Sequence, residues 1–84
     1  MMSMPNGAKL VEAIEKILAE NPKGLTTGDL DNEVVNLLNI DSDTLQEKLR
    51  DGKRSKFKYR MAWARVSAKK SRGLVKRGNL WLIP

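Results

Sequence analysis

The sequence predicts a small, mainly α-helical domain that ends in a C-terminal β-hairpin. Apolar residues recur at helical spacing through the first half, and a long helical segment begins near Ser55. Two short apolar runs then flank Gly78-Asn79, a two-residue turn typical of hairpins. A chain of 84 residues has room for one small core. We therefore expect a flexible N-terminal segment at residues 1–7 and one folded domain at residues 8–84.

The first predicted helix runs from Ala8 to Glu20 and is amphipathic. The apolar side chains that share one helical face are Leu10, Val11, Ile14, Ile17 and Leu18. The following Asn-Pro-Lys-Gly at residues 21–24 ends this helix, because proline and glycine both oppose its continuation. Leu25 comes next, and we expect one short strand there.

Two further helices are predicted before the chain becomes strongly basic. The segment Thr26-Thr27-Gly28-Asp29 offers a hydroxyl that caps a helix from about Gly28 to Leu38. A short helix from Thr44 to Arg50 should follow, with Leu45 and Leu49 facing inward. These two helices would complete the acidic half of the chain.

The last predicted helix, from Ser55 to about Ser71, is the longest, and Gly73 is its expected C-cap. The hairpin that follows should place Lys76 opposite Trp81. The order is helix, helix, short helix, long basic helix and hairpin. It is typical of a winged helix-turn-helix, in which three helices form the core and the hairpin packs as a wing beside the last of them.

The two halves of the chain carry opposite charge. Residues 53–84 hold eleven Lys and Arg and no Asp or Glu, whereas all ten carboxylates lie in residues 1–52 beside five basic residues. Eleven like charges in one short segment repel each other, and a bound polyanion would relieve that repulsion. Nucleic acid is the commonest polyanion in a cell, so the charge pattern favours a nucleic-acid partner, and we expect double-stranded DNA.

Placing the residues of the long helix at 100° intervals separates two faces. The inward face holds Phe57, Met61, Ala64 and Ala68, with Trp63 at its flank. The opposite face is a basic stripe around one small residue: Lys58, Ala62, Arg65, Lys69 and Arg72. We expect the stripe to enter the major groove, with Arg65 as the best candidate for reading a base edge. The alternative is an ordinary solvated face. Trp63 and Trp81 are expected to pack rather than bind.

Further polar residues precede and follow the stripe. Cations at the start of the long helix lie where free backbone N–H groups favour a phosphate. Lys76 and Arg77 near the hairpin tip either contact DNA or only protect an edge strand from pairing with another chain. The full set of predicted DNA-binding residues is Lys53, Arg54, Ser55, Lys56, Lys58, Tyr59, Ala62, Arg65, Lys69, Arg72, Lys76, Arg77 and Asn79.

Several motifs of the basic half resemble the Mrr N-terminal-like domain. They are Phe57-Lys58-Tyr59-Arg60-Met61-Ala62-Trp63-Ala64-Arg65, then Lys69-Lys70, Gly73-Leu74-Val75 and Arg77-Gly78-Asn79-Leu80-Trp81-Leu82-Ile83. The likeness extends over about Ala8 to Ile83, and its specific part is the C-terminal thirty residues. This resemblance implies a winged-helix domain that binds DNA, of the kind usually attached to an endonuclease domain in modification-dependent restriction proteins. It also implies a role in restriction and defence, or in regulation.

The residues of the chain do not predict an enzyme. Hydrolysis of DNA needs clustered carboxylates that hold a metal ion, whereas the carboxylates here are spread along the first half. The sequence contains no His and no Cys, which removes the usual general base and the usual zinc ligands. We expect no catalytic residue, no cofactor and no metal. No apolar run is long enough for a membrane span, so a cytoplasmic or nucleoid-associated protein is expected, with no membrane partner.

Two other functions are compatible with the same sequence. A winged-helix adaptor could dock a basic protein, or a second copy of itself, through the acidic half: Glu12, Glu15, Glu20, Asp29, Asp31 and Glu33. Alternatively, the basic half could bind RNA. Competition between duplex DNA and structured RNA would separate these partners, and charge reversal in the acidic half would test the adaptor.

Overall fold

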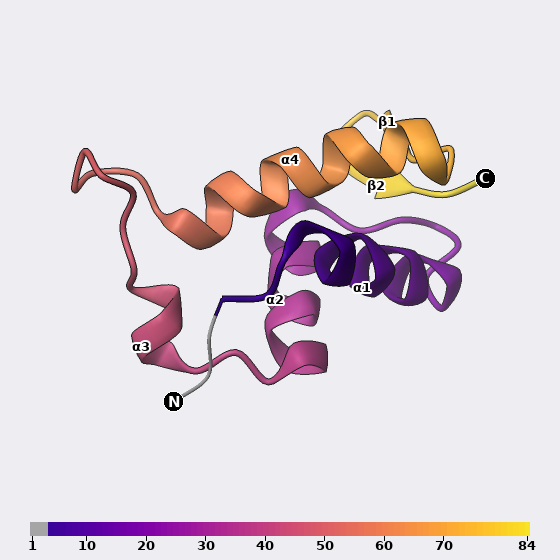
Figure 1. The fold of residues 1–84 in the computed structure, drawn as a ribbon. Helices are drawn as coiled ribbons and strands as arrows, with labels where there is room; N and C mark the ends of the chain where they lie inside the picture. Colours follow the sequence, from indigo (N-terminus) through magenta and orange to yellow (C-terminus); the bar gives the residue numbers. More distant parts are fainter. Residues whose placement is uncertain (1–3) are drawn as a thin grey trace.

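The computed structural model describes residues 4–84, and in this range the chain forms four helices and one β-hairpin (Figure 1). The helices are α1 (Gly7–Ala19), α2 (Thr27–Leu38), α3 (Ser42–Leu45) and α4 (Lys56–Ser71), and the strands are β1 (Val75–Arg77) and β2 (Leu80–Leu82). Helix α4 packs alongside α1, and the hairpin lies beside the C-terminal end of α4. The mainly helical class with a C-terminal hairpin is confirmed.

Helix α1 begins where Asn6 caps it, with the side-chain oxygen accepting a hydrogen bond from the Lys9 N–H at 2.9 Å. Its apolar face is the centre of the core, and Leu10 and Ile14 are completely buried. Of the segment 1–7, for which we expected flexibility, residues 1–3 lie outside the described part. Met4 packs against the core, so the described remainder of that segment is attached to the domain.

Helix α2 begins as the capping pattern predicts. The Thr26 hydroxyl accepts from the Asp29 N–H at 3.2 Å, and Leu30 and Val34 are fully buried. The helix ends at Asn39, which adopts the left-handed conformation with φ of 52°. This left-handed residue turns the chain so that Ile40 also reaches the core.

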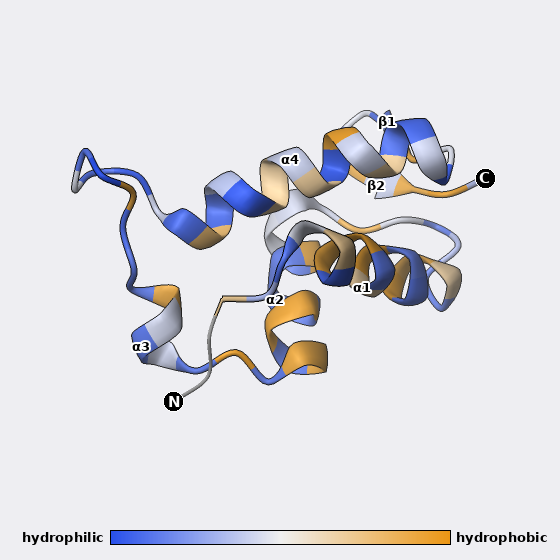
Figure 2. Ribbon diagram, in the orientation of Figure 1, coloured by the Kyte–Doolittle hydropathy of each residue, from blue (hydrophilic) through white to orange (hydrophobic). Residues whose placement is uncertain are grey.

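The predicted helix from Thr44 to Arg50 is largely wrong, because α3 ends at Leu45. The chain then folds back on itself: the Leu49 N–H donates to the Arg54 carbonyl at 2.9 Å. The carboxylate of Asp51 accepts from the Lys53 N–H, which offers the backbone a turn in place of a helix. The segment between α3 and α4 is mostly hydrophilic, whereas apolar residues concentrate on α1 and α2 (Figure 2).

Helix α4 has the predicted start and the predicted inward face. Ser55 accepts from the Lys58 N–H at 3.3 Å, and the buried residues are Phe57, Met61, Ala64 and Ala68. Trp63 is a correction, since it is 58% exposed instead of packed. It lies far enough round the helix that α1, which covers the middle of the inward face, does not reach it.

The hairpin has the predicted register, with Lys76 opposite Trp81. The positive φ falls on Gly78, the first turn residue, as a type II′ turn requires. Leu25 pairs with Trp81 through two backbone hydrogen bonds of 2.9 and 2.7 Å, so the expected short strand is present as an isolated bridge. This bridge ties the segment between α1 and α2 to the hairpin.

Candidate nucleic-acid interface

Four cations of the basic half pair with carboxylates in the structure. They are Arg54 with Asp51 at 2.8 Å, Lys56 with Glu47 at 3.4 Å, Arg65 with Asp31 at 3.3 Å and Arg72 with Glu15 at 3.0 Å. Three of these carboxylates are distant in sequence, so their positions could not be read from charge spacing along the helix. Because these four cations are already paired with carboxylates, they are less available to bind an external anion.

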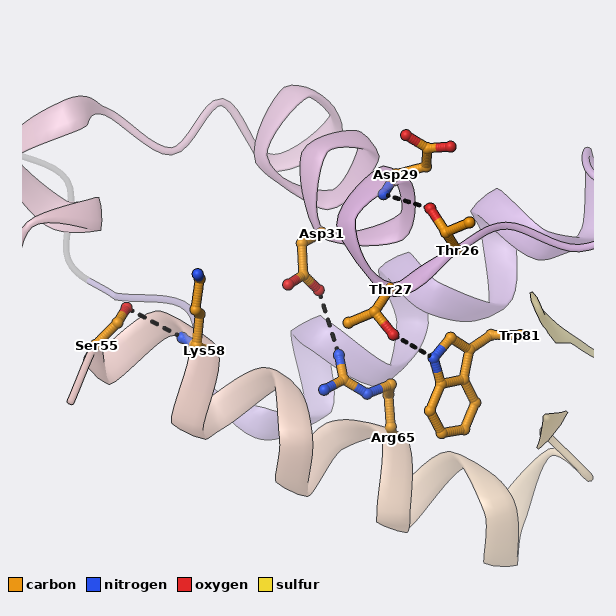
Figure 3. A network of polar contacts seen from close by, with 8 residues as sticks. All are labelled: Thr26, Thr27, Asp29, Asp31, Ser55, Lys58, Arg65 and Trp81. Atoms are coloured by element: carbon orange, nitrogen blue, oxygen red, sulfur yellow. Dashed lines mark hydrogen bonds and ion pairs between the residues drawn. The ribbon is translucent and has the colours of Figure 1, made fainter. Parts of the chain in front are cut away.

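Arg65 is the most enclosed of the four, with its side chain only 14% exposed (Figure 3). Its guanidinium pairs with the Asp31 carboxylate and also lies 5.4 Å from the centroid of the Trp81 ring. Burial raises the pKa of Asp31, although Arg65 and Lys58 oppose that rise. Arg65 therefore connects α4 to α2 and the hairpin, instead of standing free as the candidate for reading a base edge.

Two lysines, one on α4 and one on β1, lie at the same junction. The Lys69 and Lys76 ammonium groups each lie 5.3 Å from the centroid of the Trp81 ring. The indole itself is buried, and its N–H donates to the Thr27 hydroxyl at 2.8 Å (Figure 3). Trp81 thus packs as expected, and it brings the end of α4, the hairpin and the start of α2 together beneath exposed cations.

A second group of cations surrounds the start of α4. An open depression of about 490 Å³ is lined by Lys48, Lys53, Arg54, Ser55, Lys58 and Tyr59. Sequence reasoning missed Lys48, because this lysine belongs to the acidic half of the chain. The pairing of Lys48 with Ser55 across the loop brings it to the basic helix. No carboxylate lines this depression, so its walls suit an anion such as phosphate.

Lys58 connects the two groups. It lies seven residues before Arg65, on the same side of α4, and Figure 3 shows both side chains extending from that side. The outer face beside them carries Ala62, which is exposed, and Tyr59, which is 42% exposed. Arg77 and Asn79 at the hairpin tip are exposed as well.

Not all predicted residues come together. Arg72 turns toward α1 to meet Glu15, and Lys56 turns toward Glu47 in the loop after α3. Ser55 uses its side-chain oxygen to cap α4. These three side chains, like Arg65, are engaged within the domain. The other predicted residues are exposed, and they are Lys53, Arg54, Lys58, Tyr59, Ala62, Lys69, Lys76, Arg77 and Asn79.

No protein-family model matches this chain, and neither the curated proteins nor the solved structures yield a match. Among residues 4–84, no three His, Cys, Asp or Glu side chains lie close enough to hold a metal ion. The helices of this range are also too short or too polar to cross a membrane. The resemblance to the Mrr N-terminal-like domain stays a prediction.

Proposed function

We propose that this chain is a winged helix-turn-helix domain that binds duplex DNA, with α4 in the major groove and the hairpin as the wing. The order α1, Leu25, α2, α4, β1 and β2 supports this fold, since Leu25 adds a third strand to the hairpin as in a winged helix. Helix α3 and its loop are then an insertion before the recognition helix. The Mrr-like motifs of the basic half agree with the same docking.

One observation carries the proposal: within residues 4–84, five exposed cations that form no ion pair within 4 Å lie along α4, on the hairpin and in the loop just before α4. We call them the cationic ridge, and they are Lys53, Lys58, Lys69, Lys76 and Arg77. From Lys58 to Lys69 the helix rises about 16 Å, comparable with the width of the major groove at about 12 Å. Ridge cations would neutralise phosphates, while Ala62 faces the groove floor.

The test is the salt dependence of binding to a random-sequence duplex. Five phosphate contacts predict that log K falls with log salt at a slope of about −4.5. Lys58→Gln and Lys69→Gln should each reduce the magnitude of that slope by about 0.9. Lys16→Gln is the matched control, because Lys16 is exposed on α1 and lines a depression with Leu37 and Leu38 of α2, to which neither α4 nor the hairpin contributes. A slope near zero, or an equal effect of the control, would reject DNA binding through this surface.

The arrangement of the acidic half favours this function over the adaptor. Of the six carboxylates that an adaptor would use, Glu15 and Asp31 already pair with arginines of the basic half. A partner that needed both would have to displace those arginines. Structured RNA serves as a competitor in the same titration, and stronger binding to RNA than to the duplex would replace the DNA proposal with an RNA one.

A further inference from the structure

The outer face of α4 carries an aromatic strip that the ridge does not use. Tyr59, Trp63 and Val66 are 42%, 58% and 39% exposed. They are spaced four and three residues apart, so they stack along one line of the helix. Lys70 continues the same line by another four residues. The other tryptophan, Trp81, is only 7% exposed, so the fold has room to bury an indole and leaves that of Trp63 on the surface.

The geometry leaves the indole of Trp63 open. Its ring centroid lies 6.5 Å from that of Tyr59, with the planes at 72°, which is an edge-to-face contact. Tyr59 has a second neighbour, because the Arg54 guanidinium lies 5.7 Å from its ring centroid. Tyr59 is therefore held from two sides, while Trp63 presents free ring surface to solvent.

Charge decides what kind of partner fits this strip. Tyr59 also lines the depression that contains Lys48, Lys53 and Lys58, so the aromatic surface begins where the cationic surface ends. A second copy docked strip against strip would bring like charges together and be repelled. A nucleic-acid strand offers flat bases for the rings and phosphates for the cations.

We propose that Trp63 and Tyr59 stack on unpaired bases, so that the protein prefers DNA in which a single strand continues from the duplex. Within a duplex the base faces are covered by neighbouring base pairs, and only an unpaired base exposes a face for stacking. This proposal rests on the proposed function, because the cationic ridge would hold the adjoining duplex. Stacking of one base predicts roughly tenfold tighter binding to overhang DNA than to blunt DNA.

The experiment compares three DNA probes: a blunt duplex, the same duplex with a short 3′ or 5′ overhang, and the single strand alone. Affinity is measured for the unchanged protein and for Trp63→Ala, Trp63→Phe and Leu37→Ala. Leu37 is the matched control, because it is 41% exposed on α2, far from the strip in sequence. Trp63→Ala should lose the preference for the overhang and keep blunt-duplex binding, whereas Trp63→Phe and Leu37→Ala should keep both.

Fluorescence gives a second readout. The overhang probe should quench the emission of the unchanged protein, and Trp63→Phe should lose that quenching while it still binds, since Trp81 is buried. Equal affinity for blunt and overhang DNA would overturn the inference and leave duplex binding intact. If the protein bound the single-strand probe but neither duplex probe, the proposed function would be overturned, and stacking on unpaired bases would be supported. A dimer that Trp63→Ala dissociates, seen by sedimentation, would show that the strip is a self-association surface and would overturn the inference.

Discussion

Asp31 and Arg65 form an ion pair whose two side chains are only 16% and 14% exposed. At such a site the partner charge and the indole of Trp81 beside the guanidinium offset only part of the lost solvation, because burial still raises the pKa of Asp31. A single truncation leaves the other charge half-buried without a partner. The exposed pair of Arg54 and Asp51, in contrast, keeps its contact with water.

Asp31→Ala should therefore lower the free energy of unfolding by about 1–3 kcal/mol. Arg65→Ala should cost a similar amount, and the double variant should cost less than the sum of the two. Urea denaturation of the four proteins measures this coupling. Arg54→Ala is the control, and it should leave the urea midpoint almost unchanged. Strictly additive costs for Asp31 and Arg65 would contradict a direct pair.

The pKa values of Asp31 and Asp51 should be shifted in opposite directions from the ordinary aspartate value. Backbone N–H donation from Lys53, with hydrogen bonds from Arg54, lowers the pKa of Asp51 to about 2, whereas burial raises the pKa of Asp31 above 3.8. Asp51 thus contributes stability that is present above pH 3.8 and lost as pH falls through about 2. For Asp31 the folded form gains relative stability at low pH and loses it as pH rises through the raised pKa. Carboxyl ¹³C shifts measured against pH would report both midpoints, and a midpoint of Asp51 above that of Asp31 would contradict these environments.

At the scale of elements, the contact between Leu25 and the hairpin depends on Gly24. A side-chain Cβ at Gly24 would lie 2.8 Å from the Trp81 carbonyl oxygen, and its φ is 93°. Gly24→Ala should destabilise the protein by about 1–3 kcal/mol from the backbone conformation alone. Gly28→Ala is the control, because no atom lies within 4 Å of its Cβ position and the residue is helical. The melting temperatures of the two variants are compared by thermal unfolding. Equal melting temperatures for Gly24→Ala and Gly28→Ala would contradict a close approach of Gly24 to the hairpin.

How far the sequence predicts these elements depends on which forces decide them. Helices α1, α2 and α4 follow from apolar spacing and local caps such as Ser55, and the hairpin follows from its turn. The loop after α3 does not, because the turn around Asp51 competes with the helix that Leu45 and Leu49 suggest. Periodicity also places Trp63 only at the flank of the inward face, and whether a flank residue is covered depends on the neighbouring helix.

The candidate site shows the same division at larger range. The cations of the basic half are visible in the sequence, yet which of them stay free depends on tertiary contacts. Asp31 lies 34 positions from Arg65 and is brought there by the packing of α2. Lys48 joins the basic surface through pairing across a loop. Sequence spacing predicts neither contact, because each depends on how distant segments pack, so the sequence alone does not tell which cations remain unpaired.

At the scale of the whole molecule, the separation of charge has a consequence for stability. Residues 53–84 carry eleven cations, and four of them have the ion-pair partners given above, so repulsion among the others opposes folding. Added sodium chloride should raise the melting temperature, because a Debye length of about 10 Å at 0.1 M shortens to about 3 Å at 1 M. Salt also weakens the three more exposed ion pairs, but such pairs contribute little.

Duplex DNA should raise the melting temperature as well, and by an amount that grows with DNA concentration, as binding to the folded state requires. The two effects should oppose each other: in high salt the DNA-dependent rise should disappear while the salt-dependent rise remains. Differential scanning fluorimetry across a grid of salt and DNA concentrations measures both. Replacing Lys69 and Lys76 by Gln should raise stability at low salt and reduce the rise caused by DNA, since these cations crowd one indole in the free protein. If the double variant instead lost stability at low salt, cation–indole attraction would outweigh repulsion, and the junction would be a structural feature independent of any polyanion.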